Sequence, residues 1–513
     1  MIRSTLLRRS IVTPCRYKST KVNFHRPDGP GSKDAAEQAD ATATILADSL
    51  DFQKRIRPSE SAPNKLTWLD ALNEKKRQLS EGKTISSFAY QSTKTTAVGE
   101  KTRSESFSYL TLPFKDDVWL RDSYINAAGR LRVGQLFQDL DALAGRIAYR
   151  HCAPAEPVNV TASVDRIYIV KKVDDIENYN FVLTGVVTWT GRSSMEISVK
   201  GYAFPGDYPS EIKETNLSDD AVFLKADFTF VARNPETHKS FPINHLLPTN
   251  EREWLDFRRA ESHNAQKKLR AKLETLDKVP PTQQESNLIH NLYIASKAVA
   301  KLDPEQSSKL IFMKDSQVSS TLFMQPQYRN RHSYMIFGGY LLRQTFELAY
   351  CAAGAFSCAP PRFVSLDSTT FKAPVPVGAV LFMNARVCYT EHIKEEGEGD
   401  SIPVLASLLK AYELPPANQI SHDSSEFLSR PGTIIQVKVD TKIRNLDSVE
   451  AIESGSFIYS FFVPRDTEGV RDKPGYCSVV PQTYEEMMLY IEGRRRAFDT
   501  AEYAKALHEA KKA

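Results

Sequence analysis

Residues 134–152 read GQLFQDLDALAGRIAYRHC, and residues 338–357 read GGYLLRQTFELAYCAAGAFS. In the first stretch apolar side chains recur at helical spacing, as Leu136, Leu140 and Ile147 do. They cover so much of the helical surface that the pattern predicts a nearly enclosed helix. Because the second stretch repeats the leading glycine and the apolar spacing, we expect two long buried helices.

Each of these stretches is followed by a related strand-like segment. The segments are TASVDRIYIV at residues 161–170 and RFVSLDSTTF at residues 362–371. Gly134 and Gly339 are 205 residues apart, and Asp165 and Asp367 are 202 residues apart. A period this long indicates two duplicated domains, since solenoid repeats recur every 20–50 residues or so.

Alternating apolar and polar residues predict several strands after each helix. In the first copy they lie at 160–170, 181–189, 195–199 and 228–232, and in the second at 380–389, 434–442 and 457–463. One buried helix followed by antiparallel strands is an α+β unit in which a sheet wraps around a helix. We expect the first such domain at residues 106–235, a helical charged linker at 236–320, the second domain at 321–495 and a C-terminal tail at 496–513.

The N-terminal residues 1–27 contain seven basic residues and no acidic one. Apolar residues lie between the basic ones, and Arg8-Arg9 interrupts any continuous apolar core. This composition is typical of a mitochondrial transit peptide rather than a secretory signal. Residues 28–105 are polar and weakly periodic, so we expect a partly disordered extension.

Charge and motif content exclude several classes of function. The chain of 513 residues has a formal charge of +4, and without the first 27 residues 60 basic residues face 63 acidic ones. This near-neutral body argues against nucleic-acid binding. No stretch approaches the ~20 apolar residues of a transmembrane helix. The six cysteines form no CxxC pair, and serine-hydrolase, zinc, P-loop and Rossmann motifs are absent, so we expect no metal and no cofactor.

Taken together, the motifs resemble the acyl-CoA thioesterases with two hotdog domains. The resemblance is carried by the order GQLFQDLDALAG, RHC, TASVD and SSMEI in the first half, and by IFGGYLLRQTFELA, VSLD, FKAPVPVG and PQTYEEMMLY in the second. The second half is most similar to the mitochondrial acyl-coenzyme A thioesterase 9 branch. The resemblance implies tandem hotdog domains that share one continuous sheet, with the two helices side by side and active sites at the seams between the halves.

In such enzymes one half supplies an Asp on its long helix, and Asp141 occupies that position. Among Leu140, Leu143 and Ala144 its carboxylate would be desolvated, which raises its pKa and makes it a stronger base. It could activate water or attack the thioester directly, and these alternatives stay open. The N–H groups at Gly338 and Gly339 could stabilise the developing oxyanion, or the glycines could simply allow close packing. We interpret neighbouring Asp139 as a helix-surface residue.

The partner of Asp141 departs from the family pattern. Relatives often carry Asn two residues before the Phe-Gly-Gly turn, where this chain has Met335. Asn330 and His332 are the nearby polar candidates. The second helix carries Phe346 in the place of Asp141, and Arg130 aligns with the missing Asn. We therefore expect one competent and one degenerate seam.

The turn that contains Arg192, Ser193 and Ser194 aligns with a loop that approaches CoA in relatives, although it could equally be a solvated turn. The resemblance implies hydrolysis of acyl-CoA to fatty acid and CoA in the mitochondrial matrix, by a homo-oligomer such as a trimer of double hotdogs. The alternative function is a catalytically degenerate double hotdog that binds acyl groups or serves as an assembly scaffold.

Overall fold

The computed structural model describes residues 95–512, apart from 236, 238, 274–278, 304–309, 331–334, 368, 394–431 and 465–476. The chain divides into two compact units, Met1–Asp51 and Phe52–Ala513, and every described residue belongs to the second. The expected transit peptide and most of the expected polar extension therefore lie outside the described residues. Among the described helices, none combines the length and the hydropathy that a membrane span requires.

The first half of the second unit is a sheet around one long helix. The helix is α6 (Val133–Cys152), and the strands are β2 (Ser108–Leu112), β3 (Val158–Ile169), β4 (Asn180–Thr190), β5 (Ser194–Phe204) and β6 (Val222–Arg233). The strands pair antiparallel in the order β2-β4-β5-β6-β3. The buried helix and the strands predicted from the first copy are thus confirmed.

The second half repeats this arrangement in the opposite order along the sheet. Its helix is α9 (Gly338–Ser357), and its strands are β9 (Val318–Phe323), β10 (Arg362–Leu366), β12 (Val380–Ile393), β13 (Gly432–Arg444) and β14 (Ile452–Pro464). β10 pairs with β3, and the short β11 (Thr369–Thr370) extends that junction, so the two halves form one 11-stranded antiparallel sheet. α6 and α9 contact each other directly. The expected double hotdog with a continuous sheet is confirmed.

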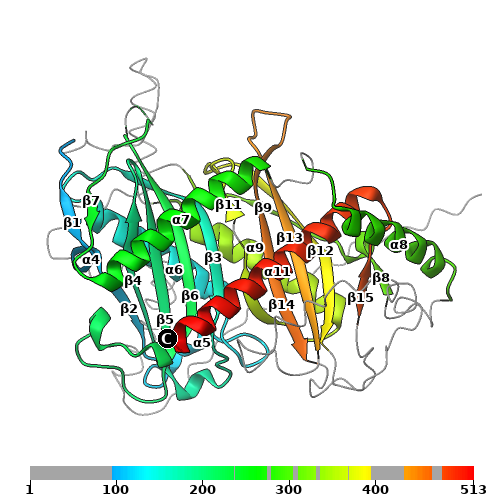
Figure 1. Ribbon diagram of the computed structural model, residues 1–513, viewed down its shortest axis with the longest axis horizontal. Coiled ribbons are helices and arrows are strands. Elements are labelled where there is room, and N and C mark those ends of the chain that lie inside the picture. Colours follow the sequence, from blue (N-terminus) through cyan, green and yellow to red (C-terminus); the bar gives the residue numbers. More distant parts are fainter. Residues whose placement is uncertain are drawn as a thin grey trace, which may run out of the picture. The chain divides into compact units, whose positions relative to one another are not determined.

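Two further helices cover the other face of this sheet. α7 (Glu251–Leu273) packs on β4 and α11 (Tyr484–Lys512) packs on β12; both cross in front of the strands in Figure 1, with α6 and α9 behind. α11 continues past residue 495, where we expected the second domain to end. The remaining described elements are β1 (Glu100–Thr102) paired with β7 (His245–Leu247), β8 (Leu310–Phe312) paired with β15 (Ser478–Val480), α4 (Arg103–Ser106), α5 (Val118–Asp122), α8 (Gln283–Val299) and short 3₁₀ turns.

An aromatic cluster fills the space between the two central helices and the sheet. Phe137 of α6 contacts Phe346 of α9 edge-to-face, with ring centroids 5.2 Å apart, and Phe363 of β10 at the same distance. Tyr459 of β14 is fully buried, and its hydroxyl lies 2.8 Å from Thr345 Oγ1. Burying each large side chain contributes about 1.5–3 kcal/mol. The core is therefore continuous across the two halves and fixes α6 against α9.

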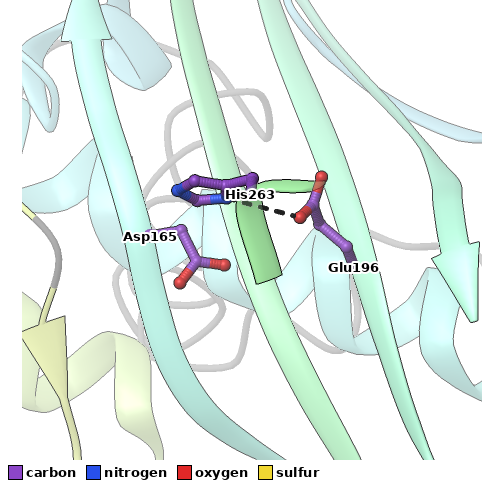
Figure 2. A group of neighbouring side chains, drawn as sticks. All are labelled: Asp165, Glu196 and His263. Carbon is purple, nitrogen blue, oxygen red and sulfur yellow. Dashed lines mark ion pairs between the residues drawn. The ribbon is translucent and has the colours of Figure 1, made fainter. Parts of the chain in front are cut away.

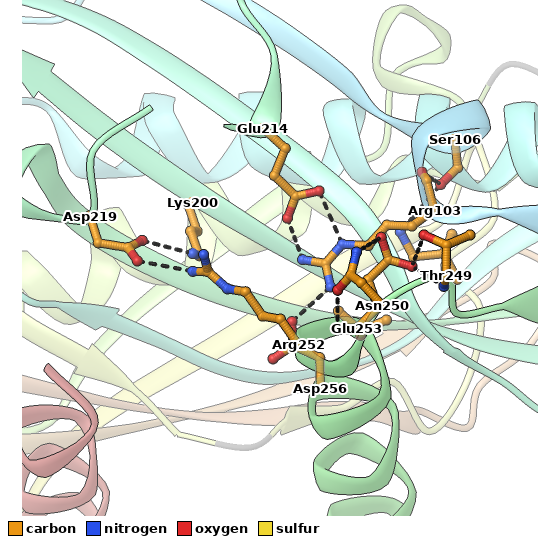
Figure 3. Close-up of polar contacts among 12 residues, drawn as sticks. Arg103, Ser106, Lys200, Glu214, Asp219, Thr249, Asn250, Arg252, Glu253 and Asp256 are labelled. Atoms are coloured by element: carbon orange, nitrogen blue, oxygen red, sulfur yellow. Dashed lines mark hydrogen bonds and ion pairs between the residues drawn. The ribbon is translucent and has the colours of Figure 1, made fainter. Parts of the chain in front are cut away.

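Ion pairs fasten the start of α7 to the first half (Figure 3). Arg103 is only 5% exposed, and its guanidinium contacts the Glu214 carboxylate and, at 2.7 Å, that of Asp256 on α7. Nearby, Arg252 donates to Asp219 at 2.9 Å, but the Arg252 side chain is 71% exposed. The two arginines thus make similar contacts in very different solvent environments.

Replacing Arg103 by methionine should lower the free energy of unfolding by about 2 kcal/mol, because charged hydrogen bonds are lost in a buried place. The same change at Arg252 should cost at most about 0.5 kcal/mol, since exposed ion pairs are screened by water. Urea denaturation followed by circular dichroism measures both. Equal effects of the two substitutions would show that burial does not set the strength of these ion pairs.

Candidate active site

Asp141 lies in the middle of α6 at the seam between the two halves. Its side chain is fully buried. Thr161 on β3 donates its hydroxyl to Oδ1 at 2.9 Å, and the backbone N–H of Gly339 on α9 donates to Oδ2 at 2.6 Å. The carboxylate of one half is thus held by the helix start of the other half.

Close approach of the backbone explains the glycine pair at the start of α9. A Cβ atom added to Gly338 would lie 3.1 Å from Asp141 Oδ2, and one added to Gly339 would lie 3.0 Å from Asp141 Cβ and 2.7 Å from the Phe337 ring. Larger residues at these two positions would therefore push α9 away from the carboxylate. The glycines bring the N-terminus of α9, with its free N–H groups and partial positive charge, against Asp141.

Burial and hydrogen bonding act in opposite directions on Asp141. Burial raises the pKa of Asp141 to about 6, while the hydrogen bonds from Thr161 and Gly339 pull it downward. The pKa is raised because a charged carboxylate loses its hydration in the protein interior. At neutral pH the group is mostly ionised and is a stronger base than a solvated aspartate, as a general base requires.

Thr161 is a functional candidate that the sequence interpretation did not single out. It precedes a β-bulge, because the register of β3 against β6 shifts between Thr161 and Ser163. The bulge turns Thr161 toward α6, whereas Ser163 and Asp165 face Lys267 of α7 on the opposite side of the sheet. Simple alternation along the strand would place all three on one face.

Substituting Thr161 with valine should shift the pH dependence of hydrolysis to higher pH. The hydroxyl lowers the pKa of Asp141, so its removal leaves the carboxyl protonated over a wider range. The loss of activity should therefore be larger at pH 6 than at pH 8, as measured by kcat/KM profiles. Thr229→Val is the matched control, because Thr229 donates instead to Asp165. An unshifted profile in Thr161→Val would contradict this role.

Of the two polar candidates before α9, the structure describes Asn330 but not His332. Asn330 lies at the base of a loop, where its N–H donates to the Met335 carbonyl at 2.7 Å. No hydrogen bond joins the described Asn330 side chain to Asp141, so its catalytic role stays a prediction. His332 lies outside the described residues. The interpretation of Asp139 as a surface residue is wrong, because Asp139 is fully buried and accepts a hydrogen bond from the Tyr124 hydroxyl.

The turn between β4 and β5 carries the three residues predicted to approach CoA. Arg192 is exposed, while Ser193 and Ser194 are half-buried. Their carbonyl groups accept backbone hydrogen bonds from Ile243, Ala232 and Gly191, respectively. Backbone hydrogen bonds therefore fix the turn, and the Arg192 side chain is exposed to solvent. Contact with CoA stays a prediction.

The second seam has the same architecture without the polar pair. Gly134 at the start of α6 faces Phe346 of α9, and a Cβ added to Gly134 would lie 3.0 Å from the Phe346 ring. Phe363 of β10 occupies the position of Thr161, since it pairs with Phe461 as Thr161 pairs with Phe230. Phe346 and Phe363 contact each other edge-to-face at 5.5 Å. Where the first seam has the Asp141 carboxylate and the Thr161 hydroxyl, the second seam has the rings of Phe346 and Phe363.

A polar cluster on the opposite face of the sheet contains two carboxylates and a histidine, which are side chains that can bind a metal ion. Asp165, Glu196 and His263 offer atoms within 4.8 Å of one another, and in Figure 2 the two strand carboxylates lie on either side of the α7 histidine. The Lys267 ammonium already contacts Asp165, and Asn264 donates to Glu196 at 3.1 Å. Because α7 supplies a cation and a donor, the cluster fastens α7 to the sheet.

Comparisons with known proteins find acyl-CoA thioesterases. No family model matches the chain. Acyl-coenzyme A thioesterase 9, mitochondrial, of Mus musculus is 28% identical over 82% of this chain and 83% of its own. Acyl-coenzyme A thioesterase 2, chloroplastic, of Humulus lupulus is 35% identical over 57% of this chain, and the match spans 65% of the hop protein. A solved acyl-CoA hydrolase from Staphylococcus aureus is 22% identical, with a TM-score of 0.27 over 34% of this chain and 92% of that one.

The similarity to the mouse protein extends over 82% of the chain. Other mitochondrial thioesterases of this group, from mouse, human and cattle, are 27–28% identical over 76–82% of the chain. The chain folds as a double hotdog, and its sequence is similar to those of the mitochondrial acyl-coenzyme A thioesterases 9 and 10.

Proposed function

We propose that the chain hydrolyses acyl-coenzyme A thioesters to a fatty acid and CoA, with Asp141 as the catalytic residue. The observation that carries the proposal is a buried carboxylate on α6 that is held by the backbone of the Gly338-Gly339 helix start, with a pKa raised to about 6. The names of the similar proteins support the same activity. No metal or cofactor takes part in the proposed reaction.

In the proposed reaction Asp141 removes a proton from water as the water attacks the thioester carbonyl. The C–S bond then breaks, and the thiolate of CoA takes up a proton. Gly339 orients the base, because its N–H already donates to Asp141. Gly338 is the candidate donor to the carbonyl oxygen, because its N–H has no acceptor among the described residues.

Direct attack by Asp141 on the thioester is the alternative route, and it would form a mixed anhydride. A single turnover in ¹⁸O-labelled water distinguishes the two. Direct attack of water places the label only in the released fatty acid. Label in the Asp141 carboxylate, detected by mass spectrometry, would instead support the anhydride.

The proposed CoA contact is Arg192 with Ser193 and Ser194. An exposed guanidinium on a turn with a fixed backbone could bind a phosphate through two parallel hydrogen bonds. Asn330 and His332 remain the proposed polar partners of Asp141 across the seam. We propose that residues 236–320, which include α7 and α8, form the linker between the two hotdogs.

The activity is tested with purified full-length chain and acyl-CoAs from two to 18 or so carbons. Free thiol released at pH 8 should appear with at least one chain length, at a rate within the typical enzymatic range of about 1–10³ s⁻¹. No turnover with any acyl-CoA would contradict the proposal. It would favour the second candidate, an acyl-binding scaffold, which is motivated by the loss of the polar pair from the second seam.

We also propose a location and an assembly for the chain, namely the mitochondrial matrix and a homo-oligomer. Several similar proteins are named as mitochondrial, which supports a mitochondrial location for this chain, and we propose the matrix. Import of a fluorescent fusion with and without residues 1–27 tests this. A homo-oligomer, such as a trimer of double hotdogs, is tested by sedimentation of the purified protein.

A further inference from the structure

A cavity of about 370 Å³ lies at the second seam, between the start of α6 and the middle of α9. This volume is within the range of small-molecule sites in proteins. Its apolar wall is formed by Phe346, Tyr350 and Phe363 from the second half and by Ile169 and Phe223 from the first. The cavity is therefore built by both halves, like the seam that contains Asp141.

Basic side chains surround this apolar wall. The lining includes five basic residues and two acidic ones, a net charge of +3; the basic ones are Arg130, Arg132, Lys171, Lys172 and Arg362. Asp174 contacts Arg362 and, at 2.7 Å, Lys172, and Glu347 contacts Arg132 at 2.9 Å. Even with these carboxylates in place, the cavity keeps an excess of positive charge.

Arg130 lies just before α6 and lines the cavity. Its guanidinium donates to the Pro360 carbonyl at 3.1 Å, and no carboxylate of the described residues lies within ion-pair distance of it. Burial and the neighbouring Arg362 lower the pKa of Arg130. A guanidinium in a half-buried place is stabilised when an anion binds beside it.

The basic positions around this cavity are not basic at the aligned positions of the first seam. Each residue of the second seam can be aligned with its counterpart in the first seam. The offset is 205 residues for positions around α6 and α9 and 202 residues for the strand segments that follow, and the strand register supports this alignment. None of the five basic residues has a basic counterpart; the aligned residues are Met335, Phe337, Ala373, Pro374 and Val160. The second seam therefore differs from the first in two ways. It lacks counterparts of Asp141 and Thr161, and it has five basic residues where the first seam has uncharged ones.

We propose that the second seam binds a phosphorylated small molecule with an apolar or aromatic part, and that it does not hydrolyse this ligand. Phosphate groups match the excess charge and the forked donors of arginine. The aromatic wall accepts the apolar part. Hydrolysis does not occur there because Phe346 and Phe363 replace the base and its hydrogen-bond donor. CoA and its thioesters are one source of this chemistry, and adenine nucleotides are another.

Equilibrium dialysis of full-length chain against CoA and, separately, ADP tests this proposal without relying on hydrolysis. Arg130→Gln should weaken binding of the ligand at the second seam by about tenfold or more. Ala127→Tyr provides an independent variant, because exposed Ala127 lines the cavity and a ring there fills it from the surface. Arg386→Gln is the control with the same change of charge, on β12. Thermal unfolding confirms that each variant is folded.

The outcomes separate the possibilities. Loss of one bound equivalent in both cavity variants but not in the control supports the proposal, and the ligand that is lost identifies the source. Because the measurement is binding, this result stands even if the thioesterase activity fails. Binding that is equal in all four proteins, or no binding of either ligand, would overturn it. Inorganic phosphate competing as well as CoA or ADP would also overturn it, since the apolar wall would then contribute nothing.

Discussion

Replacing Asp141 by asparagine should lower kcat for acyl-CoA hydrolysis by about 10²–10⁴-fold. Asparagine keeps the size of the side chain and can still accept a hydrogen bond from Thr161 or Gly339, but it cannot take a proton from water. The contacts that position residue 141 should therefore survive while the chemistry is lost. Thiol release under saturating acyl-CoA measures the effect.

The pH dependence of kcat/KM in the wild-type enzyme should report the ionisation of the Asp141 carboxyl group. Because the pKa of Asp141 is about 6, kcat/KM should rise with pH to half of its maximum near pH 6 and become constant above pH 7. This rise should be absent in Asp141→Asn. A wild-type profile that stays flat from pH 5 to pH 8 would mean that Asp141 is not the base.

The same substitution should make the protein more stable at high pH. A folded pKa above the ordinary value of 3.8 means that the folded state binds the proton more tightly than the unfolded state does. The stability gained from protonation is present at low pH and is lost as the pH rises through about 6. Ionised Asp141 thus costs about 3 kcal/mol at neutral pH, which asparagine avoids, less any hydrogen bond it loses. Urea unfolding should show a larger gain at pH 8 than at pH 5.

Asp139→Asn is the matched control for these measurements. Asp139 is on the same helix and is equally buried, but its hydrogen bond comes from Tyr124 rather than from the second half. Its substitution should leave kcat and the pH profile close to those of the wild type. An equal loss of kcat in both variants would show that any carboxyl-to-amide change in α6 disrupts the seam.

The helices and strands could be predicted because their patterns are local. Leu136, Leu140 and Ile147 repeat at helical spacing, and the later strands alternate, so each element is visible within a short stretch of sequence. The duplication then implied that the two halves are equivalent. Asp141 and the Gly338-Gly339 pair could be assigned to one seam because of the resemblance to the double-hotdog thioesterases, in which one half supplies the Asp and the other half supplies the glycine-containing helix start.

Other parts of the site depend on contacts that no local pattern contains. Thr161 faces Asp141 because of a β-bulge, and one extra residue in a strand moves a side chain to the other face of the sheet. Asp139 is buried because Tyr124, from a loop before α6, covers it. The cations around the second cavity come from segments far apart in the sequence, such as Arg130 before α6 and Arg362 on β10, and the fold brings them to one cavity.

Gly338→Ala should reduce kcat by about 10²-fold or more while the protein remains folded. The added Cβ would lie 3.1 Å from Asp141 Oδ2 and 3.4 Å from Thr161 Oγ1, in the space in front of the carboxylate. A displacement of reacting groups by about 1 Å is enough for a loss of this size. Because methyl groups fit this tight space only if the carboxylate moves, the change acts on the geometry of the base rather than on its identity.

The duplication provides the control for this prediction at the other seam. In Gly134→Ala the new Cβ would lie 3.0 Å from the Phe346 ring and 3.0 Å from Glu347 Oε1, so the steric demand is similar. That seam has no base, so kcat should stay near the wild-type value even where stability falls by a similar amount in both variants. Comparing kcat and the urea midpoint of the two separates catalysis from packing. Equal losses of kcat in the two variants, with the urea midpoint lowered only in Gly338→Ala, would mean that both seams catalyse and would contradict a single active seam at Asp141.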